Sequence, residues 1–450
     1  MRTDPSTLPP TTLQRLVAMF GQAMRELGQS PSDTELEQWS VLIHASMSGR
    51  GRSYHTVDHI FDVYDEHGPP DAIGTLAILF HDTVYFEVDG GLPRGLELYL
   101  SDALEVEHDR VELGPFDPEH DTLRALVARI FGFEPGQAVT LQSGLNELAS
   151  ALLAVRALCT HLTLGELAQV ITCIEATRPF RPVGAEEDLA ARLAQADQEH
   201  DLGLGEEGVA RAGVRAVGIS NRDVANFAYE DTGLFLSYTW EIIPETSPTL
   251  RLPAYTLGEY RVAMTKMSGF FAGLTPERVF REFRGQPSGV SLSKLRAQAA
   301  INLERGTRYL REKLLSARLL ESLALMTGGD APVSLLMGDL PASDKPVTRL
   351  EDLLPETPAP VKDADPEVLR LLVEGRQRDS GFDLKTSPLA AYLYAHMGAA
   401  ATDAALASDE GAPFLTAIPR EALAEVVQAC MRIAPTRAKA LEGVLSRLPS

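Results

Sequence analysis

A short apolar segment that ends in two polar residues constrains the fold of this 450-residue chain more than any other feature. Residues 72–82, AIGTLAILFHD, are apolar on nearly every side and follow Asp71, a residue type that caps helices. Such a helix must be buried among other elements. His81 and Asp82 at its end are then costly to bury unless each has a charged partner or a metal ion.

The remaining sequence favours helices as the neighbours of this segment. Ala and Leu are abundant, aromatic residues make up only 6% of the chain, and no run of apolar–polar alternation predicts a strand. We therefore predict an all-α fold, in which the buried segment belongs to a helical bundle.

Breaks in the helical pattern suggest four parts. Residues 1–205 are predicted to form one helical domain, in which residues 83–145, rich in Gly, Pro and acidic residues, are an insertion. Residues 206–326 are expected to be a helical extension. The Pro-rich stretch 327–366 is predicted to be a linker, and residues 367–450 a C-terminal helical segment.

The charge and the termini limit the partners that we expect. A formal net charge of −22 argues against nucleic acid or an anionic membrane as the main partner, because both select basic surfaces. The three cysteines are scattered, and no basic region followed by an apolar one marks a secretory signal. No apolar run approaches the length of a membrane span. These features together predict a cytoplasmic protein.

Four polar motifs carry the candidate chemistry. They are RSYHTVDH at 52–59, FHDTVY at 80–85, NELASA at 146–151 and ADQEHDLG at 196–203. His55 and His59 are four residues apart, a spacing that places both on one face of a predicted helix. Neutral imidazole and carboxylate groups together suit divalent ions such as Mn, Fe, Co, Ni or Zn. The motifs therefore indicate a metal site that helices distant in the sequence would share.

The order of these motifs resembles the HD superfamily of metal-dependent phosphohydrolases over roughly residues 40–205. The resemblance is closest to a subgroup of predicted hydrolases with the motifs YHxxxH, FHDxxY and NExxSA. It implies His59, His81, Asp82 and a last aspartate as ligands; Asp197 is the preferred candidate, and Asp201 remains open. About sixty residues (83–145) separate the second and third motifs here, where the subgroup has a short segment.

The resemblance implies a reaction as well as a fold. A divalent ion (Mn, Mg, Fe, Co, Ni or Zn) would activate water for hydrolysis of a phosphoester, and the substrate would be a nucleotide or another small phosphorylated metabolite. Glu147 is the candidate base or water-orienting group, although a carboxylate in a first helical turn also stabilises the helix dipole. His55 is a candidate partner of a ligand, general acid, or ligand of a second ion. Three arginines are candidates for binding phosphate oxygens: Arg52, Arg178 and Arg181.

Two other functions fit parts of the same pattern. A non-catalytic HD-based protein that senses a ligand or regulates a partner would use residues 83–145 and the chain beyond 327 as partner surfaces. An HD-type di-iron oxygenase would need more histidines around two ions, and His55 is the one extra candidate. The ordered ligand motifs favour the hydrolase.

Overall fold

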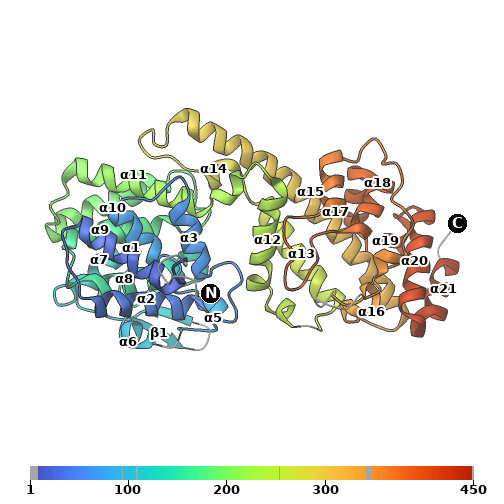
Figure 1. The fold of residues 1–450 in the computed structure, drawn as a ribbon, viewed down its shortest axis with the longest axis horizontal. Coiled ribbons are helices and arrows are strands. Elements are labelled where there is room, and N and C mark those ends of the chain that lie inside the picture. Colours follow the sequence, from blue (N-terminus) through green and yellow to red (C-terminus); the bar gives the residue numbers. More distant parts are fainter. Residues whose placement is uncertain (1–8, 94, 108–109, 253, 341–346, 448–450) are drawn as a thin grey trace, which may run out of the picture. The chain divides into compact units, whose positions relative to one another are not determined.

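The computed structural model describes residues 9–93, 95–107, 110–252, 254–340 and 347–447. Helices dominate these residues, and the strands among them form one small sheet, so the predicted all-α class is confirmed. The chain divides into two compact units, each described here by itself (Figure 1). Unit 1 comprises the chain up to Ala225 together with Pro276–Ala297, and unit 2 comprises Asn226–Thr275 and the chain from Gln298 onward.

Unit 1 is a bundle around the apolar segment singled out above. That segment is helix α4, whose nine residues are all buried, and the side chain of Asp71 accepts a 2.9 Å hydrogen bond from the backbone N–H of Gly74 as its cap. The surrounding elements of unit 1 are α1 (Thr12–Glu26), α2 (Asp33–Met47), α3 (Val57–Asp65), α4 (Ala72–Phe80), α5 (Phe86–Asp89), α6 (Glu97–Leu100), β1 (Leu104–Glu107), β2 (Arg110–Leu113), α7 (Thr122–Phe131), β3 (Ala138–Val139), α8 (Leu145–Leu158), α9 (Leu164–Ala176), α10 (Ala185–His200), α11 (Gly205–Asp223) and α14 (Pro276–Val279).

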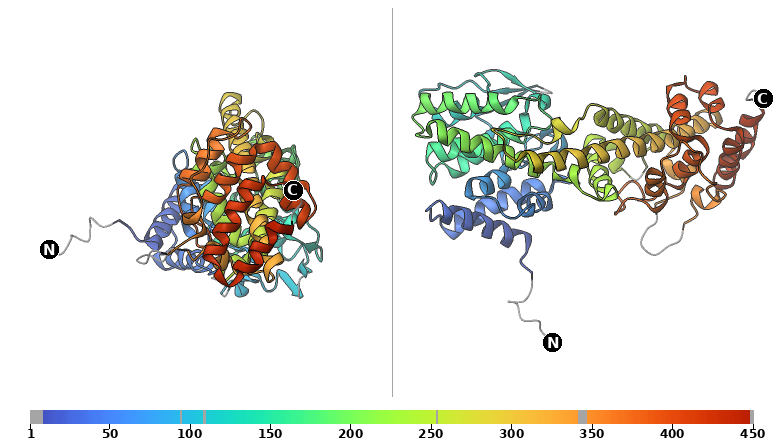
Figure 2. Two further views of the ribbon diagram at one scale, coloured as in Figure 1. Left: turned by 90° about the vertical axis from the view of Figure 1, so that its right-hand side faces the viewer. Right: turned by 90° about the horizontal axis from the view of Figure 1, so that it is seen from above.

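The predicted insertion 83–145 is an integral part of unit 1. Its strands pair antiparallel in the order β1-β2-β3, and Figure 2 shows them at one edge of the unit. Leu100, Leu113 and Leu126 are fully buried in the same core as α4. The strands escaped prediction because each is only two to four residues long, too short for an alternating pattern to stand out.

Helix α11 extends unit 1 beyond the predicted boundary at residue 205. Helix α10 ends at His200, the chain turns through Gly203 and Gly205, which both have positive φ, and α11 returns to the same core. Ala212, Ala216 and Ile219 of α11 are buried among residues of α4 and α9. The glycines therefore mark a turn inside unit 1 and not a domain boundary, because the apolar face of α11 packs against α4 and α9.

Unit 2 is also helical and has its own core. Its longest helix, α15, begins in the part of the chain that belongs to unit 1 and continues into unit 2. The elements are α12 (Thr232–Thr246), α13 (Leu257–Ala272), α15 (Gly289–Thr327), α16 (Val333–Met337), α17 (Pro366–Glu374), α18 (Pro388–Ala407), α19 (Ala412–Thr416), α20 (Arg420–Ile433) and α21 (Ala438–Arg447).

The segment predicted as a linker, 327–366, lies inside unit 2, and residues 341–346 of it are outside the described residues. Leu336 of α16 and Leu350 are fully buried in one core with Leu423 of α20. The stretch therefore does not separate a C-terminal segment from the rest. Its prolines break helices, but the leucines between them are buried in the core. The proline content predicts the breaks and says nothing of this burial.

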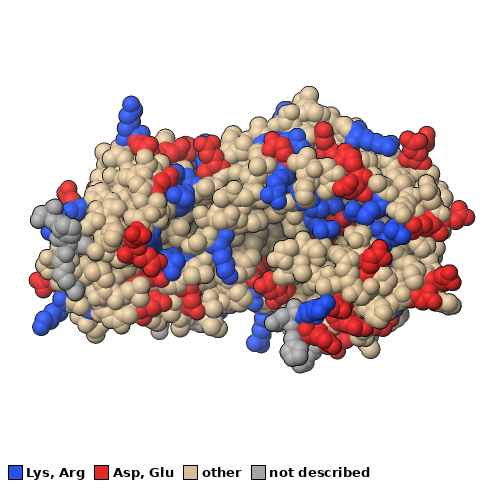
Figure 3. Space-filling model, turned by 180° about the vertical axis from the view of Figure 1, so that it is seen from behind, with Lys and Arg blue, Asp and Glu red and all other residues tan. Residues whose placement is uncertain are grey.

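Figure 3 shows acidic and basic side chains interspersed over the face that it presents, rather than a continuous basic field. Among the described residues, no helix combines the length and the apolar character that crossing a bilayer requires. All three cysteines are free.

Candidate metal centre

Three helices bring four ligand-type side chains to one place in unit 1. His59 lies in the first turn of α3, His81 directly follows α4, and Asp223 is the last residue of α11. His81 keeps a helical backbone and donates its N–H to the carbonyl of Ala77, so α4 runs directly into the His81–Asp82 pair. All four residues lie at or near helix ends, and both histidines are buried.

The four side chains converge closely enough to share one ion. Nε2 of His59 lies 3.0 Å from Oδ1 of Asp223 and 3.6 Å from Oδ2 of Asp82. Nε2 of His81 lies 3.0 Å from Oδ2 of Asp82 and 3.5 Å from Oδ1 of Asp223. One ligand atom from each of the four residues lies within 4.8 Å of the other three. Two imidazoles and two carboxylates form a donor set that divalent transition metals favour.

The hydrogen bonds of His81 test whether a cation fits this place. Its Nδ1 lies 2.8 Å from the carbonyl oxygen of Ile78, an acceptor, so Nδ1 carries a proton. In the neutral ring Nε2 then presents a lone pair to two carboxylates. That atom is fully buried and makes no hydrogen bond to any described residue. A metal ion resolves this conflict, and a backbone carbonyl on the other ring nitrogen is the arrangement that fixes metal-binding histidines.

The electrostatics show how strongly the four groups interact. Burial would raise the pKa of Asp82 and Asp223, but the facing histidines hold both below their usual range. Burial would lower the pKa of His81, but the carboxylates of Asp82 and Asp223 raise it well above its usual value. Both shifts have the same cause, since the two carboxylates favour a positive charge among the four side chains. A divalent ion would supply that positive charge.

Asp223 occupies the position for which the sequence suggested Asp197. The carboxylate of Asp197 instead accepts hydrogen bonds of 2.9 and 2.8 Å from the backbone N–H groups of Leu204 and Gly205, at the start of α11. Asp201, the other candidate, ends α10 in a left-handed conformation and is exposed. Asp197 therefore caps the turn that leads into α11, and the last ligand-type carboxylate comes one helix later.

A close contact between two helices explains why Asp223 reaches the centre. A Cβ added to Gly74 of α4 would lie 3.1 Å from Cδ1 of Ile219, so α11 crosses α4 tightly at a residue without a side chain. Ile219 is one turn before Asp223. The sequence gives little indication that Asp223 belongs to the centre, because it ends an amphipathic helix like any other polar residue. The crossing of α11 and α4 places it beside the His81–Asp82 pair.

Arg52, a predicted substrate-binding residue, is committed to the protein itself. Its Nε and Nη2 bond both carboxylate oxygens of Asp89, at 2.9 and 2.6 Å. Nη1 donates to the carbonyls of His55 and Asp82, and Nη2 also donates to that of Thr83. These five bonds use all five N–H donors of a side chain with no exposed surface. Arg52 therefore holds the backbone of the centre in place and has no donor left for a phosphate.

His55 lies at the centre, although not on the predicted helix. Helix α3 begins at Val57, so the segment 52–56 is a turn. The ring of His55 packs 5.8 Å from that of His59 and 4.4 Å from that of Tyr85, centroid to centroid. Its charge also contributes to the low pKa of Asp82. Arg52 donates to the carbonyl of His55 and so holds this residue outside the helix.

The NELASA motif lines the centre from α8. Oδ1 of Asn146 accepts the N–H of Phe86 at 2.9 Å, and Oγ of Ser150 accepts that of Val84 at 3.1 Å, so both hold the chain that follows Asp82. Glu147 between them is buried. Burial, reinforced by the negative charge of Asp82 and then Asp223, raises its pKa to about 7. Glu147 thus belongs to the same electrostatic site and exchanges a proton near neutral pH.

Arg178 and Arg181 lie together and share one buried acid. Nη1 of Arg181 is 2.5 Å from Oε2 of Glu175, and Nη1 of Arg178 is 3.2 Å from its Oε1. Arg181 is buried and Arg178 is partly exposed. The charge of Arg178 acts on Glu147 and lowers its pKa, opposing the effect of burial. Neither arginine belongs to the group of four ligand-type residues.

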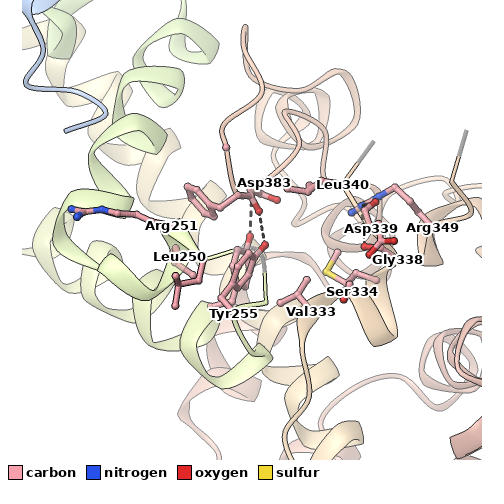
Figure 4. Close-up of a pocket in the computed structure, with 15 residues that line it drawn as sticks. Leu250, Arg251, Tyr255, Val333, Ser334, Gly338, Asp339, Leu340, Arg349 and Asp383 are labelled. Atoms are coloured by element: carbon pink, nitrogen blue, oxygen red, sulfur yellow. Dashed lines mark hydrogen bonds between the residues drawn. The ribbon is translucent and has the colours of Figure 1, made fainter. Parts of the chain in front are cut away.

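Unit 2 contains a separate cavity of about 290 Å³ (Figure 4). Tyr255, Tyr260 and Asp383 line it, and the hydroxyl of Tyr260 donates to Oδ2 of Asp383 at 3.3 Å. The same oxygen also accepts from Nε1 of Trp240 and from Nζ of Lys313, both at 2.8 Å. Because its carboxylate is saturated by protein donors, Asp383 stabilises unit 2 and presents no reactive group to the cavity.

Comparisons of the chain with family models, with curated proteins and with solved structures found no match. The candidate centre therefore rests on its own geometry.

Proposed function

We propose that unit 1 is a divalent-metal-dependent phosphohydrolase that hydrolyses a phosphoester of a nucleotide or another small phosphorylated metabolite. The observation that carries the proposal is the convergence of two imidazole nitrogens and two carboxylate oxygens within 4.8 Å. His59, His81, Asp82 and Asp223 would hold the ion. When bound, it would lower the pKa of water and neutralise charge on a phosphoryl group.

Two further side chains would move protons. Glu147, with a pKa of about 7 and its carboxylate in the field of Asp82, would accept the proton of the attacking water. His55 would donate a proton to the oxygen of the leaving group, since its ring lies beside that of His59. Together they would connect the formation of the new P–O bond with the cleavage of the old one. Arg52 would act only by positioning the backbone of Asp82.

The two alternatives from the sequence have less support. The regulatory reading relied on residues 83–145 and the chain beyond 327 as partner surfaces, yet both contribute leucines to the cores of their units. A di-iron oxygenase needs ligands for two ions. The described residues contain one four-residue group of ligand type, with His55 as a neighbour. The hydrolase is the candidate function that gives a role to the four ligand-type residues and also to Glu147 and His55.

The test combines metal analysis with a panel of phosphoesters. Purified protein is analysed for bound Mn, Mg, Fe, Co, Ni and Zn, and is assayed with nucleotides, cyclic nucleotides and sugar phosphates. We expect a bound divalent ion and hydrolysis of one class, with both reduced on the order of 100-fold or more in His81→Ala and Asp82→Ala.

The matched controls are His120→Ala and Asp117→Ala, which alter an exposed His–Asp pair of the same chain. Both controls should keep the ion and the activity. Hydrolysis that survives in His81→Ala and Asp82→Ala would refute the proposal. Nucleotide binding without turnover would support the regulatory protein, and two irons per chain with a visible chromophore would support the oxygenase.

A further inference from the structure

Four arginines of unit 1 meet around two acids. Oε1 of Glu175 lies 2.8 Å from Nη2 of Arg192, in addition to its contact with Arg178 and the bond between Oε2 and Arg181. Oε1 of Glu186 lies 3.1 Å from Nη1 of Arg281. The arginine cluster, as we name it, consists of Arg178, Arg181, Arg192 and Arg281 with Glu175 and Glu186.

The charges of this cluster do not balance. Four guanidiniums face two carboxylates, and Glu175, Glu186, Arg181 and Arg281 are all more than nine-tenths buried. Burial lowers the pKa of Arg281, and the neighbouring charge of Arg181 lowers it further. The buried guanidiniums of Arg181 and Arg281 are balanced by the two buried carboxylates, so the unmatched positive charges are those of the partly exposed Arg178 and Arg192, beside which an anion would be stabilised.

One donor of the cluster is unused. Nε of Arg181 is buried and has no hydrogen-bond partner within the described chain. Arg178 and Arg192 keep 21% and 26% of their side chains exposed, so the cluster is open on their side. A guanidinium with a spare N–H beside other guanidiniums is the arrangement that binds phosphate oxygens.

The cluster adjoins the candidate metal centre at two points. The side chain of Arg178 lies against Gly144, where an added Cβ would be 2.6 Å from its Nε, and Gly144 directly precedes the helix that carries Glu147. Asn221 donates to the carbonyl of Arg281 and accepts its backbone N–H, both at 2.9 Å. Asn221 is two residues before Asp223 on α11. The cluster thus contacts the start of α8, which carries Glu147, and the last turn of α11, which carries Asp223.

We propose that the arginine cluster binds a second phosphate group of the substrate, so that the molecule hydrolysed at the metal centre carries at least two phosphate groups. This inference rests on the proposed function. The first group would lie at the metal centre, and the second would supply the missing negative charge beside Arg178 and Arg192. Free inorganic phosphate has the same chemistry and is the other source of such an anion.

The binding arm uses inorganic phosphate on the full chain, measured by calorimetry in EDTA. The variants are His81→Ala, which disables the metal centre, and Arg178→Gln and Arg192→Gln, which change the two partly exposed arginines in the His81→Ala background. We expect phosphate binding to persist in His81→Ala and to weaken at least tenfold in each arginine variant. Arg178→Lys, which keeps the charge, should restore part of the affinity, and circular dichroism verifies folding.

The matched control is Arg211→Gln, an exposed arginine of unit 1 whose side chain pairs only loosely with Glu207, at 3.5 Å. It should bind phosphate as the parent does. Absence of phosphate binding in His81→Ala, or equal binding in all arginine variants, would overturn the anion site. This arm needs no turnover, so it stands or falls separately from the hydrolase proposal.

The kinetic arm decides between the two sources. With substrates that differ by one phosphate group, Arg192→Gln should raise KM for the molecule with two groups roughly 10- to 100-fold and leave kcat nearly unchanged, because the charges that act on Glu147 include Arg178 and not Arg192. KM for the molecule with one group should stay the same. No effect on either substrate would show that the cluster binds free phosphate only, and equal effects on both would overturn the assignment of the cluster to a second phosphate group. If no phosphoester is turned over, binding of AMP and ADP to the same variants gives the same comparison.

Discussion

Nη1 of Arg52 donates a 2.7 Å hydrogen bond to the backbone carbonyl of Asp82, so a fully buried guanidinium fixes the residue that carries one of the four candidate ligands. The same side chain bonds Asp89 through two nitrogens and the carbonyls of His55 and Thr83. A charged group that resembles a phosphate-binding residue in the sequence thus acts as an internal support.

Arg52→Lys tests this support, because an ammonium group keeps the charge but has no planar set of five donors. We expect the free energy of unfolding of unit 1 to fall by on the order of 3 kcal/mol and the metal affinity to fall about 10- to 100-fold. Urea unfolding and metal titration measure the two effects. Arg110→Lys is the matched control, since Arg110 is an exposed arginine paired with Glu112. Unchanged metal affinity in Arg52→Lys would rule out the positioning role.

The two aspartates that compete for the last ligand position can be separated by substitution. Asp223→Asn should abolish stoichiometric metal binding, because it removes a carboxylate 3.0 Å from the imidazole of His59. Asp197→Asn should keep the ion and cost about 1 kcal/mol of stability at most, because it alters only a helix cap. Metal analysis and thermal unfolding of the two variants provide the measurement. Loss of the ion in Asp197→Asn with retention in Asp223→Asn would reverse the assignment.

Glu147 gives the metal-free protein a specific dependence on pH. In the folded state its pKa is about 7, whereas its ordinary value is 4.5. The protonated carboxyl group makes its full contribution to the free energy of unfolding below pH 4.5. This contribution, about 3 kcal/mol in total, is lost as the pH rises through about 7. Metal-free Glu147→Gln should therefore unfold at a higher temperature than the parent at pH 8, and the two should agree near pH 4.5. If the unfolding temperatures of the variant and the parent differed by the same amount at both pH values, the raised pKa of Glu147 would be contradicted.

Asp383 should be essential to unit 2 and irrelevant to the metal centre. Asp383→Ala leaves the buried cations Lys313 and Arg376 without their shared carboxylate, and we expect a loss of about 3–5 kcal/mol. Trp240 donates to the same carboxylate, so its fluorescence reports the change once the other tryptophan is removed by Trp39→Phe. The metal content should stay the same. Simultaneous loss of the ion would mean that the two units do not fold independently.

The sequence by itself determined the class of fold and three of the four ligand-type residues. The apolar run of α4 requires burial whatever surrounds it, and it carries the His81–Asp82 pair into the core. His59 was indicated by the order of the motifs, through the resemblance that they carry, and not by burial or periodicity alone. Such features are local, because helical periodicity and the cost of burying charge can be read from neighbouring residues.

Only the tertiary structure decided the roles of Asp223, Asp197 and Arg52. Asp223 reaches the centre because α11 crosses α4 at Gly74, a contact between residues 145 positions apart in the chain, Gly74 and Ile219. Arg52 is excluded from substrate binding because five acceptors converge on it from three separate segments. The sequence shows which residues are charged, but the packing of distant helices decides which of them come into contact. The chemical behaviour of a charged side chain depends on those contacts.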